Sequence, residues 1–352
     1  MRAPAFWRET GIASALLAPL AGLYGWAAAA RMRRPGSAAG VPVICVGDPT
    51  LGGAGKTPAA LAIGRCLLAA GERPFFLSRG YGGRARGPLV VDPRRHGAAE
   101  VGDEPLLLAR IAPTVVARAR PAGAALAREH GASVIVMDDG FQNPSLAKDF
   151  AVLVLDGRRG IGNARVFPAG PLRAPLNIQL ERAQAVIAVG AIAAAAGVLA
   201  KAEARGIPVF RGRLEPDARA LAALAGKDVL AFAGIAHPQK FFATLAEAGI
   251  HIGARRAFAD HHRYGAKEAA SLLAEADRHG LVPVTTEKDL VRIAGDPRTA
   301  ALAARAQAVP VELVLDHEAE FQALVLSAIR GQKSEVRTQG IPGSPPGSPT
   351  DL

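Results

Sequence analysis

The hydrophobic pattern of the chain consists of short apolar runs separated by segments of helix-forming composition. Such runs, bounded by turn residues, are typical of strands buried on both faces of a parallel sheet. Right-handed crossovers then bring the carboxyl ends of these strands to one rim, where ligands bind. The pattern predicts six strands of this kind, at residues 41–47, 74–78, 114–117, 133–140, 151–157 and 185–190.

A second and smaller α/β unit is predicted to begin near residue 216. Strands are expected at 229–236 and 310–316, and residues 282–293 supply another strand and the start of a helix. A helix at 317–330 closes the fold, and the residues after it are polar and rich in Pro, Gly and Ser, a composition typical of disorder. The predicted organisation is an N-terminal hydrophobic helix at 1–35, a main domain at 36–215, a C-terminal lobe at 216–330 and a disordered tail at 331–352.

The segment 41–58 carries the strongest chemical signal. A β-branched run leads into a glycine-rich loop, then into Lys56 and Thr57, and then into a helical segment rich in Ala and Leu. This layout indicates a nucleotide-phosphate loop, in which backbone N–H groups face the phosphates, the lysine reaches the β- and γ-phosphates and the hydroxyl binds Mg²⁺. The match to GxxxxGK(S/T) is imperfect at the first glycine position, so an ordinary strand-to-helix turn remains an alternative. The predicted phosphate-binding residues are Thr50, Leu51, Gly52, Gly53, Ala54, Gly55, Lys56 and Thr57.

Residues 11–30 carry no charge and are followed at once by Arg31, Arg33 and Arg34. The segment is long enough to cross a bilayer, but it consists mostly of Ala and Gly, with Pro19 in the middle. Three alternatives remain open: a helix that lies on or inserts weakly into a membrane, a cleaved signal peptide, and a buried core helix. The first is favoured. The predicted nucleotide loop close behind argues against export, because ATP is cytoplasmic, and the arginines would keep the following domain in the cytoplasm.

Charge and composition narrow the classes of partner. The formal net charge is +11, yet the basic residues are scattered and only 5% of the residues are aromatic. A nucleic-acid partner is therefore not expected, whereas an anionic membrane surface or a phosphorylated substrate fits the charge, as does a merely solvated basic surface. Cys45 and Cys66 belong to no Cys/His cluster, so we expect two small buried residues and no zinc site.

Carboxylates and histidines offer candidates for metal binding and proton transfer. Asp138 and Asp139 end an apolar strand at the ligand rim, where a carboxylate can hold Mg²⁺ opposite a phosphate loop. Asp103 is a candidate base, although an Asp before Glu-Pro is also a good helix cap, and composition alone favours the cap. His261 and His262 are adjacent, so at most one of them is expected to point into a site.

Seven short motifs follow one another along the chain: TLGGAGKTP at 50–58, SRGYGG at 78–83, VGDEP at 101–105, DDGFQ at 138–142, FPAGPLRAP at 167–175, FADHH at 258–262 and TTEKDLVR at 285–292. Each motif alone is weak. Together and in this order, the chain resembles the tetraacyldisaccharide 4′-kinases, the lipid A 4′-kinases of Gram-negative bacteria. The resemblance runs from the N-terminal hydrophobic helix to about residue 330.

The resemblance implies a membrane-associated P-loop kinase with two α/β lobes, a mostly parallel sheet covered by helices on both faces, and an active site in the cleft. The implied cofactors are ATP and Mg²⁺. The implied reaction transfers the γ-phosphate of ATP to the 4′-hydroxyl of a tetraacylated glucosamine disaccharide 1-phosphate, giving lipid IVA. The expected partners are this glycolipid and the cytoplasmic face of the bacterial inner membrane, because four acyl chains do not leave a bilayer cheaply.

The resemblance also implies roles for individual residues. Asp103 acts as the base, supported by His261, while Lys56, Thr57 and Asp138 keep the roles expected above, with Asp139 beside them. Contacts with phosphate oxygens or with the substrate are further implied for Arg79, Arg173, Gln142 and Asn143. For the two arginines, surface or structural ion pairing is the alternative.

Two positions depart from the family pattern. Asp48 stands just before the loop where the family usually has Asn, and its charge should weaken phosphate binding unless it points away or pairs with a cation. Asn143 replaces a His, which removes any proton transfer there but leaves hydrogen bonding to the substrate. These departures keep one alternative open, a non-catalytic membrane-tethered nucleotide-binding module. A nucleic-acid-dependent ATPase is the weaker third hypothesis.

Overall fold

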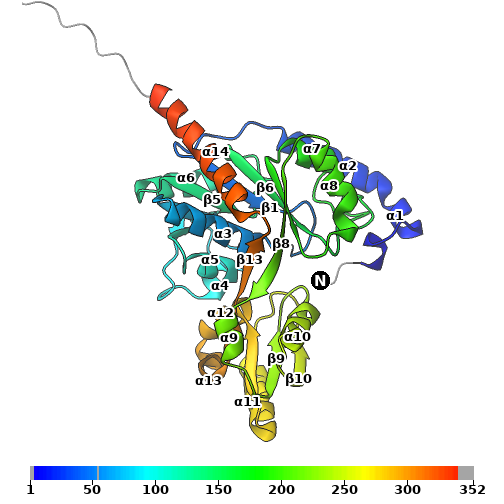
Figure 1. The fold of residues 1–352 in the computed structure, drawn as a ribbon, viewed down its shortest axis with the longest axis vertical. Helices are drawn as coiled ribbons and strands as arrows, with labels where there is room; N and C mark the ends of the chain where they lie inside the picture. Colours follow the sequence, from blue (N-terminus) through cyan, green and yellow to red (C-terminus); the bar gives the residue numbers. More distant parts are fainter. Residues whose placement is uncertain (1–3, 54, 340–352) are drawn as a thin grey trace, which may run out of the picture.

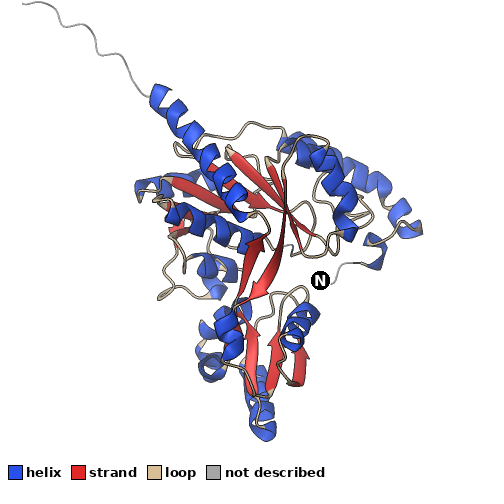
Figure 2. Ribbon diagram, in the orientation of Figure 1, coloured by secondary structure: helices blue, strands red, loops and turns tan. Residues whose placement is uncertain are grey.

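The computed structural model describes residues 4–53 and 55–339, with side chains up to residue 331. Two α/β units lie one above the other along the long axis of the molecule, and the larger one carries the N-terminal helices on its flank (Figure 1). Each unit is a sheet with helices packed around it (Figure 2). The fold is thus α/β with two sheets, as predicted.

The large sheet has nine strands, and its central strand β1 (Val43–Gly47) is parallel to a neighbour on each side. Cys45 pairs in register with Met137 on one side and with Ala151 on the other, which places the start of the phosphate loop in the middle of the sheet. Two terminal pairs, β13–β8 and β3–β4, are antiparallel. The spatial order is β13 (Val311–Leu315), β8 (Val209–Pro216), β7 (Ala185–Val189), β6 (Phe150–Asp156), β1, β5 (Val134–Asp138), β2 (Pro74–Ser78), β4 (Thr114–Val116) and β3 (Leu89–Val90).

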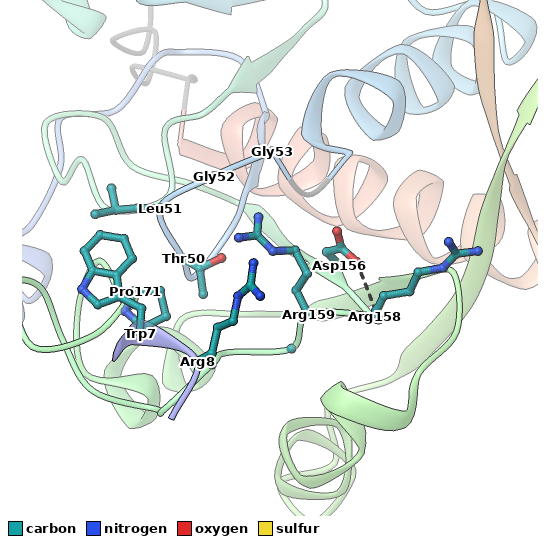
Figure 3. Close-up of a pocket in the computed structure, with 12 residues that line it drawn as sticks. Trp7, Arg8, Thr50, Leu51, Gly52, Gly53, Asp156, Arg158, Arg159 and Pro171 are labelled. Carbon is teal, nitrogen blue, oxygen red and sulfur yellow. Dashed lines mark hydrogen bonds between the residues drawn. The ribbon is translucent and has the colours of Figure 1, made fainter. Parts of the chain in front are cut away.

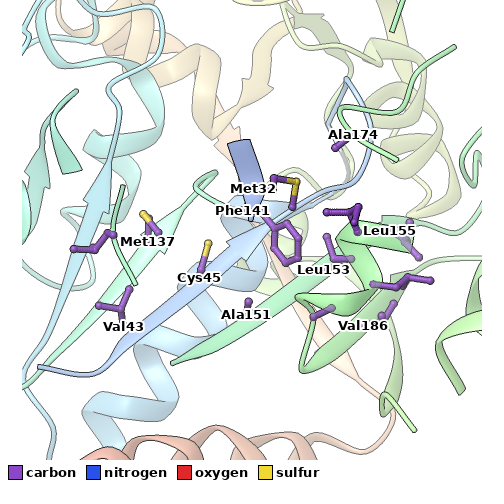
Figure 4. Close-up of a cluster of buried hydrophobic side chains, with 14 of the residues drawn as sticks. Met32, Val43, Cys45, Met137, Phe141, Ala151, Leu153, Leu155, Ala174 and Val186 are labelled. Carbon is purple, nitrogen blue, oxygen red and sulfur yellow. The ribbon is translucent and has the colours of Figure 1, made fainter. Parts of the chain in front are cut away.

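Helices cover both faces of this sheet, because most of its strands are apolar on both sides. One core cluster joins the strands to α2, α6, α7 and α8 and includes Met137, Phe141 and Leu153 (Figure 4). The other joins them to α3, α5 and α14, through residues such as Ile63 and Phe321. The helices of the large unit are α2 (Ala18–Met32), α3 (Lys56–Ala69), α4 (Ala98–Val101), α5 (Asp103–Leu108), α6 (Arg120–Glu129), α7 (Leu176–Glu181), α8 (Ala196–Glu203) and α14 (Glu318–Gln339), with a 3₁₀ turn η2 (Ala193–Ala195).

The small unit is a four-stranded parallel sheet, also with apolar clusters on both faces. Its strand order is β10 (Ile252–Ala257), β9 (Val229–Ala233), β11 (Val282–Thr286) and β12 (Gln307–Val309). Its helices are α9 (Ala218–Ala222), α10 (Pro238–Glu247), α11 (Ala266–His279), α12 (Glu287–Ala294), η3 (Pro297–Thr299) and α13 (Ala300–Arg305).

The chain returns to the large unit after the small one, which the predicted boundary at 216–330 did not anticipate. Strand β13 pairs antiparallel with β8, and Phe321 of α14 packs edge-on against Phe210 of that strand. The apolar run at 310–316 shows only that a strand exists, and its partner is set by long-range packing. Helix α14 also extends beyond residue 330 to Gln339, because residues 331–339 are polar but contain no Pro. The rest of the predicted tail, 340–352, lies outside the described residues.

Four strands escaped the sequence prediction: β3 and β12 are only two and three residues long, and β8 and β10 are not continuous apolar runs. Strand β8 alternates buried and exposed residues over part of its length, and β10 is an edge strand whose side chains are mostly exposed. Cys45 and Cys66 are both buried and unpaired, as expected.

The N-terminal segment forms a short turn and two helices, η1 (Ala5–Trp7), α1 (Ile12–Leu16) and α2, instead of one continuous helix. The break at Leu17 precedes Pro19, which lies in the first turn of α2, where its missing N–H costs no helical hydrogen bond. Within the described residues, none of the helices combines the length and apolar character needed to cross a bilayer.

Candidate active site

The loop that the sequence predicts to bind phosphate joins the end of β1 to the start of α3, which is the expected layout. Gly55 precedes the helix with φ at 91°, a conformation that residues with a side chain rarely adopt. Gly47 ends the strand against Phe141, whose Cβ would lie 2.4 Å from any added Cβ. The described part of the turn consists of residues 50–53 and 55–57, and Ala54 lies outside the described residues.

A second segment braces this loop. The Leu51 amide donates to the Pro171 carbonyl at 2.8 Å, and the Arg173 amide donates to the Pro49 carbonyl at 2.9 Å. Gln142 is buried and donates to the Asp48 carbonyl at 2.8 Å. The FPAGPLRAP and DDGFQ motifs thus hold the phosphate loop in place, and the amide nitrogen of Gln142 is used for that purpose rather than facing a ligand.

Four charged side chains meet beneath the loop. Lys56 Nζ lies 2.8 Å from Asp48 Oδ2 and 3.8 Å from Asp139 Oδ1. Arg173 Nη2 lies 3.0 Å from Asp48 Oδ1, close enough for an ion pair although not aligned for a hydrogen bond, and Arg173 Nη1 donates to Asp139 Oδ1 at 3.1 Å. Asp48 thus meets the condition set by the sequence: its added charge is paired with two cations.

Asp48 is fully buried, and this burial raises its pKa to about 6 despite the opposing effect of Lys56 and Arg173. Burial acts against the charge of Lys56 as well, but Asp48 and Asp139 outweigh it and raise the lysine pKa. Lys56 is therefore charged and held by Asp48. A bound phosphate would compete with Asp48 for the same ammonium group.

We expect Asp48→Asn to tighten Mg-ATP binding by about three- to tenfold, because one negative charge beside the phosphates disappears while the lysine charge stays. Isothermal titration calorimetry at fixed pH measures the change. Asp316→Asn, which removes a surface carboxylate paired with Arg213, serves as the control. Weaker binding by Asp48→Asn would show that Asp48 orients Lys56 for the phosphates.

Asp138 lies at the end of β5, beside the loop threonine. Thr57 Oγ1 donates to Asp138 Oδ2 at 3.3 Å, whereas Asp138 Oδ1 is buried and has no hydrogen-bond partner among the residues that the structure describes. Burial, with Glu104 and Asp139 nearby, raises the pKa of Asp138 to about 7. A hydroxyl, an unpartnered carboxylate oxygen and adjacent phosphate oxygens form the oxygen-rich ligand set that Mg²⁺ takes in such sites, so the residues fit this ion.

Asp103 begins α5 and is buried against the small unit. Arg292 of α12 donates to Asp103 Oδ2 through Nε at 2.9 Å and through Nη2, and His261 Nδ1 lies 3.5 Å from the same oxygen. Burial raises the pKa of Asp103, but the His261 contact and the charges of Arg292 and Lys288 outweigh it, so the pKa lies well below the usual range. His262 turns away to Glu268 at 3.0 Å, so only one of the two histidines points toward Asp103.

Arg292 and Lys288 are the residues that the sequence did not single out. Arg292 also donates to the Gly234 carbonyl and to Asp289, and Lys288 Nζ lies 2.7 Å from Glu104. Both belong to the TTEKDLVR motif, which marked the segment, but nothing in the local pattern says that α12 faces α5.

The remaining predicted substrate residues lie in different settings. The Arg79 side chain is exposed and forms no ion pair with the residues that the structure describes, so it remains available. Asn143 Oδ1 accepts from the Ser145 amide at 2.8 Å, which is a local turn contact. Arg173 is close to the loop but occupied by two carboxylates. The structure thus brings Lys56, Thr57, Asp138, Asp139 and Arg173 together, and it brings Asp103 to His261.

Comparison with known proteins identifies relatives over almost the whole chain. The model of the Tetraacyldisaccharide-1-P 4′-kinase family matches residues 13–330. Proteins named tetraacyldisaccharide 4′-kinase from Methylobacterium sp. (strain 4-46) and Rhodopseudomonas palustris (strain BisA53) are 56% and 54% identical. Each alignment covers 94% of this chain, and 99% and 96% of the respective relative.

A solved structure agrees with these matches. The crystal structure of Aquifex aeolicus LpxK in complex with ATP superposes with a TM-score of 0.70 at 26% identity, covering 90% of this chain and 99% of that one. Identity above half over nearly the full length of both proteins is far beyond what a shared fold alone produces. The chain belongs to the tetraacyldisaccharide 4′-kinase family.

Proposed function

We propose that the protein transfers the γ-phosphate of ATP to the 4′-hydroxyl of a tetraacyldisaccharide 1-phosphate, the step of lipid A biosynthesis that forms lipid IVA. One observation carries the proposal: a glycine-rich strand-to-helix loop that leads into Lys56, and a buried Asp103 with His261 beside it, occur in one chain of this family. The loop would bind the phosphates of the donor, and the carboxylate of the pair would accept the proton of the acceptor hydroxyl.

The donor is expected to lie along the loop and the start of α3. Backbone N–H groups and the helix N-terminus favour phosphate there, and Lys56 is positioned to exchange Asp48 for a phosphate oxygen. Thr57 and Asp138 would hold Mg²⁺, which when bound neutralises charge on the phosphates. Asp139 holds Lys56 and Arg173 in place from the other side.

The acceptor hydroxyl is expected to donate a hydrogen bond to Asp103. A carboxylate with so low a pKa is a weak base, so it accepts the proton late, once the new bond to phosphorus has made the hydroxyl strongly acidic. Such timing suits phosphoryl transfer, in which positioning contributes more than proton removal. His261 and Arg292 orient the carboxylate, and Arg292 does so from the small unit, so both units are needed.

The test is transfer of labelled γ-phosphate from Mg-ATP to tetraacyldisaccharide 1-phosphate in detergent micelles. A bis-phosphorylated lipid that forms only with the 4′-hydroxyl free supports the proposal. Absence of product, in a preparation that binds ATP, would contradict it.

We further propose that α1 and α2 dock on the membrane at the cytoplasmic face of the bacterial inner membrane. Apart from Met32, the two helices bury small residues, including Gly25 and Ala28, and leave several large apolar ones exposed. Five of these are between 59% and 83% exposed and recur every three or four residues, so they share one face. They are Ile12, Leu16, Leu20, Leu23 and Trp26.

We expect the double substitution Leu20→Glu and Leu23→Glu to release the protein from vesicles that contain anionic lipid. Both side chains are already exposed, so the melting temperature should stay unchanged while a charge opposes burial in the interface. Co-sedimentation with vesicles measures the bound fraction. Leu68→Glu is the matched control, because Leu68 is an exposed leucine on α3. Equal binding by all three proteins would place the contact elsewhere.

A further inference from the structure

A cavity of about 360 Å³ lies beside the phosphate loop, on the side away from Asp138. Four segments line it: the first half of the loop, at 50–53, the turn after β6, at 156–162, the N-terminal turn η1 with Arg8 behind it, and Pro171 of the segment that braces the loop. Figure 3 shows Arg8 and Arg159 directed toward Thr50 and the loop glycines, with the tryptophan indole on the opposite wall. The proposed function involves the loop wall of this cavity but assigns no ligand to the space between the loop, η1 and the turn after β6.

The cavity carries positive charge that is not neutralised. The Arg8 side chain forms no hydrogen bond or ion pair with another described residue. Within the described residues, the Arg159 side chain has a polar contact only with His237, whose pKa is lowered by burial and by the Arg159 and Lys240 charges, so that imidazole is neutral near pH 7. Asp156, the one carboxylate among the described residues of the wall, is engaged by Lys240. Two guanidinium groups therefore face the same space.

Contacts of the backbone hold the segments that carry these two arginines next to each other. Gly162 has φ at 57° and lies so close to the Trp7 carbonyl that an added Cβ would approach its oxygen to 2.2 Å. The Asn163 amide donates to that carbonyl at 2.8 Å, and its side chain donates to the Phe6 carbonyl at 3.0 Å. These contacts fix η1 on the turn after β6, which carries Arg159. The two arginines thus share a preorganised frame.

We propose that Arg8 and Arg159 bind the 1-phosphate of the acceptor lipid, an inference that rests on the proposed function. Guanidinium groups match phosphate geometry, and two of them can neutralise a phosphate monoester. The matching family takes its name from a disaccharide 1-phosphate, so the acceptor carries such a group. The indole and Pro171 add apolar walls, which suit the faces of a sugar ring.

The place of the cavity favours the acceptor over the nucleotide. Lys56 and Thr57 direct the donor phosphates to the second half of the loop, whereas the cavity touches the first half. The cavity also adjoins the helices that carry the apolar stripe of exposed residues Ile12, Leu16, Leu20, Leu23 and Trp26, because Trp7 and, on α2, Tyr24 both pack edge-on against the Phe167 ring. A lipid with its acyl chains at that stripe would present its sugar phosphate between the membrane and the loop.

The experiment measures initial rates with two acceptors, the tetraacyldisaccharide 1-phosphate and its analogue with a free 1-hydroxyl. The proteins are wild type, Arg159→Ala, Arg159→Lys and Arg8→Ala. Arg158→Ala is the matched control: this neighbouring arginine also lines the cavity, but its guanidinium points away from Arg8 and Arg159 (Figure 3). Melting temperatures report on folding.

For Arg159→Ala and Arg8→Ala we expect the acceptor KM to rise about tenfold, with kcat and the KM for ATP within about twofold of wild type. The analogue should not distinguish these variants from wild type, and Arg159→Lys should recover part of the loss. A raised KM for ATP with unchanged preference for the 1-phosphate would overturn the inference and assign the cavity to the nucleotide. Unchanged kinetics would overturn it as well. Absence of product from wild type would instead contradict the proposed function.

Discussion

Lys56→Ala is expected to lower kcat by about 10³-fold, the cost of losing a preorganised cation at a charge that develops in the transition state. Lys56 is the ammonium group at the start of α3, and its contact with Asp48 keeps it beneath the loop. Mg-ATP binding should weaken less than turnover, because the loop amides and the metal still hold the phosphates. Single-turnover kinetics together with calorimetric binding separate the two effects.

Removing Lys56 also leaves Asp48 buried with only Arg173 as a counter-charge, and this alone could disturb the loop. The double variant Lys56→Met with Asp48→Asn removes both charges at similar volume. It should regain the melting temperature that Lys56→Ala loses while remaining inactive. Recovery of turnover in the double variant would mean that Lys56 serves loop structure and not phosphoryl transfer.

Asp103→Asn is expected to lower kcat by about 10²- to 10⁴-fold, the usual range for losing a general base, with the KM for ATP little changed. The amide preserves volume and can still accept from Arg292, so the contact between the two units should persist. His261→Ala should cost less than Asp103→Asn. The double variant should be no slower than Asp103→Asn, because the histidine acts through the carboxylate.

The pH profile gives the same residue a second test. Because the pKa of Asp103 is lowered, the carboxylate stays ionised as the pH falls through the neutral and mildly acidic range, so it should add no acidic limb to kcat there. Any decrease of kcat with falling pH that occurs above about pH 5 should therefore persist in the residual activity of Asp103→Asn. Disappearance of that limb in the variant would show that Asp103 itself titrates near neutrality and that His261 and Arg292 do not hold it charged.

Local pattern predicted most of the strands and the phosphate loop. Residues 74–78 form a strand with the predicted bounds, and the apolar runs around 43–47 and 134–138 form the central strands. Buried strands of this kind are recognisable because every position is apolar on both faces. Edge strands such as β10 lack that signal, so they were missed. The site motifs were likewise visible, although the roles of their residues stay predictions.

The tertiary structure decided which distant residues meet. Asp103 and Arg292 are 189 positions apart, and neither helix pattern records that α12 faces α5. The same limit applies to strand β13, which returns to the large sheet, and to Asp48, whose charge the chain alone could not show to be paired. Periodicity reports only which side of an element is apolar. The partner of that side, and of each buried charge, is chosen by the packing of the whole chain.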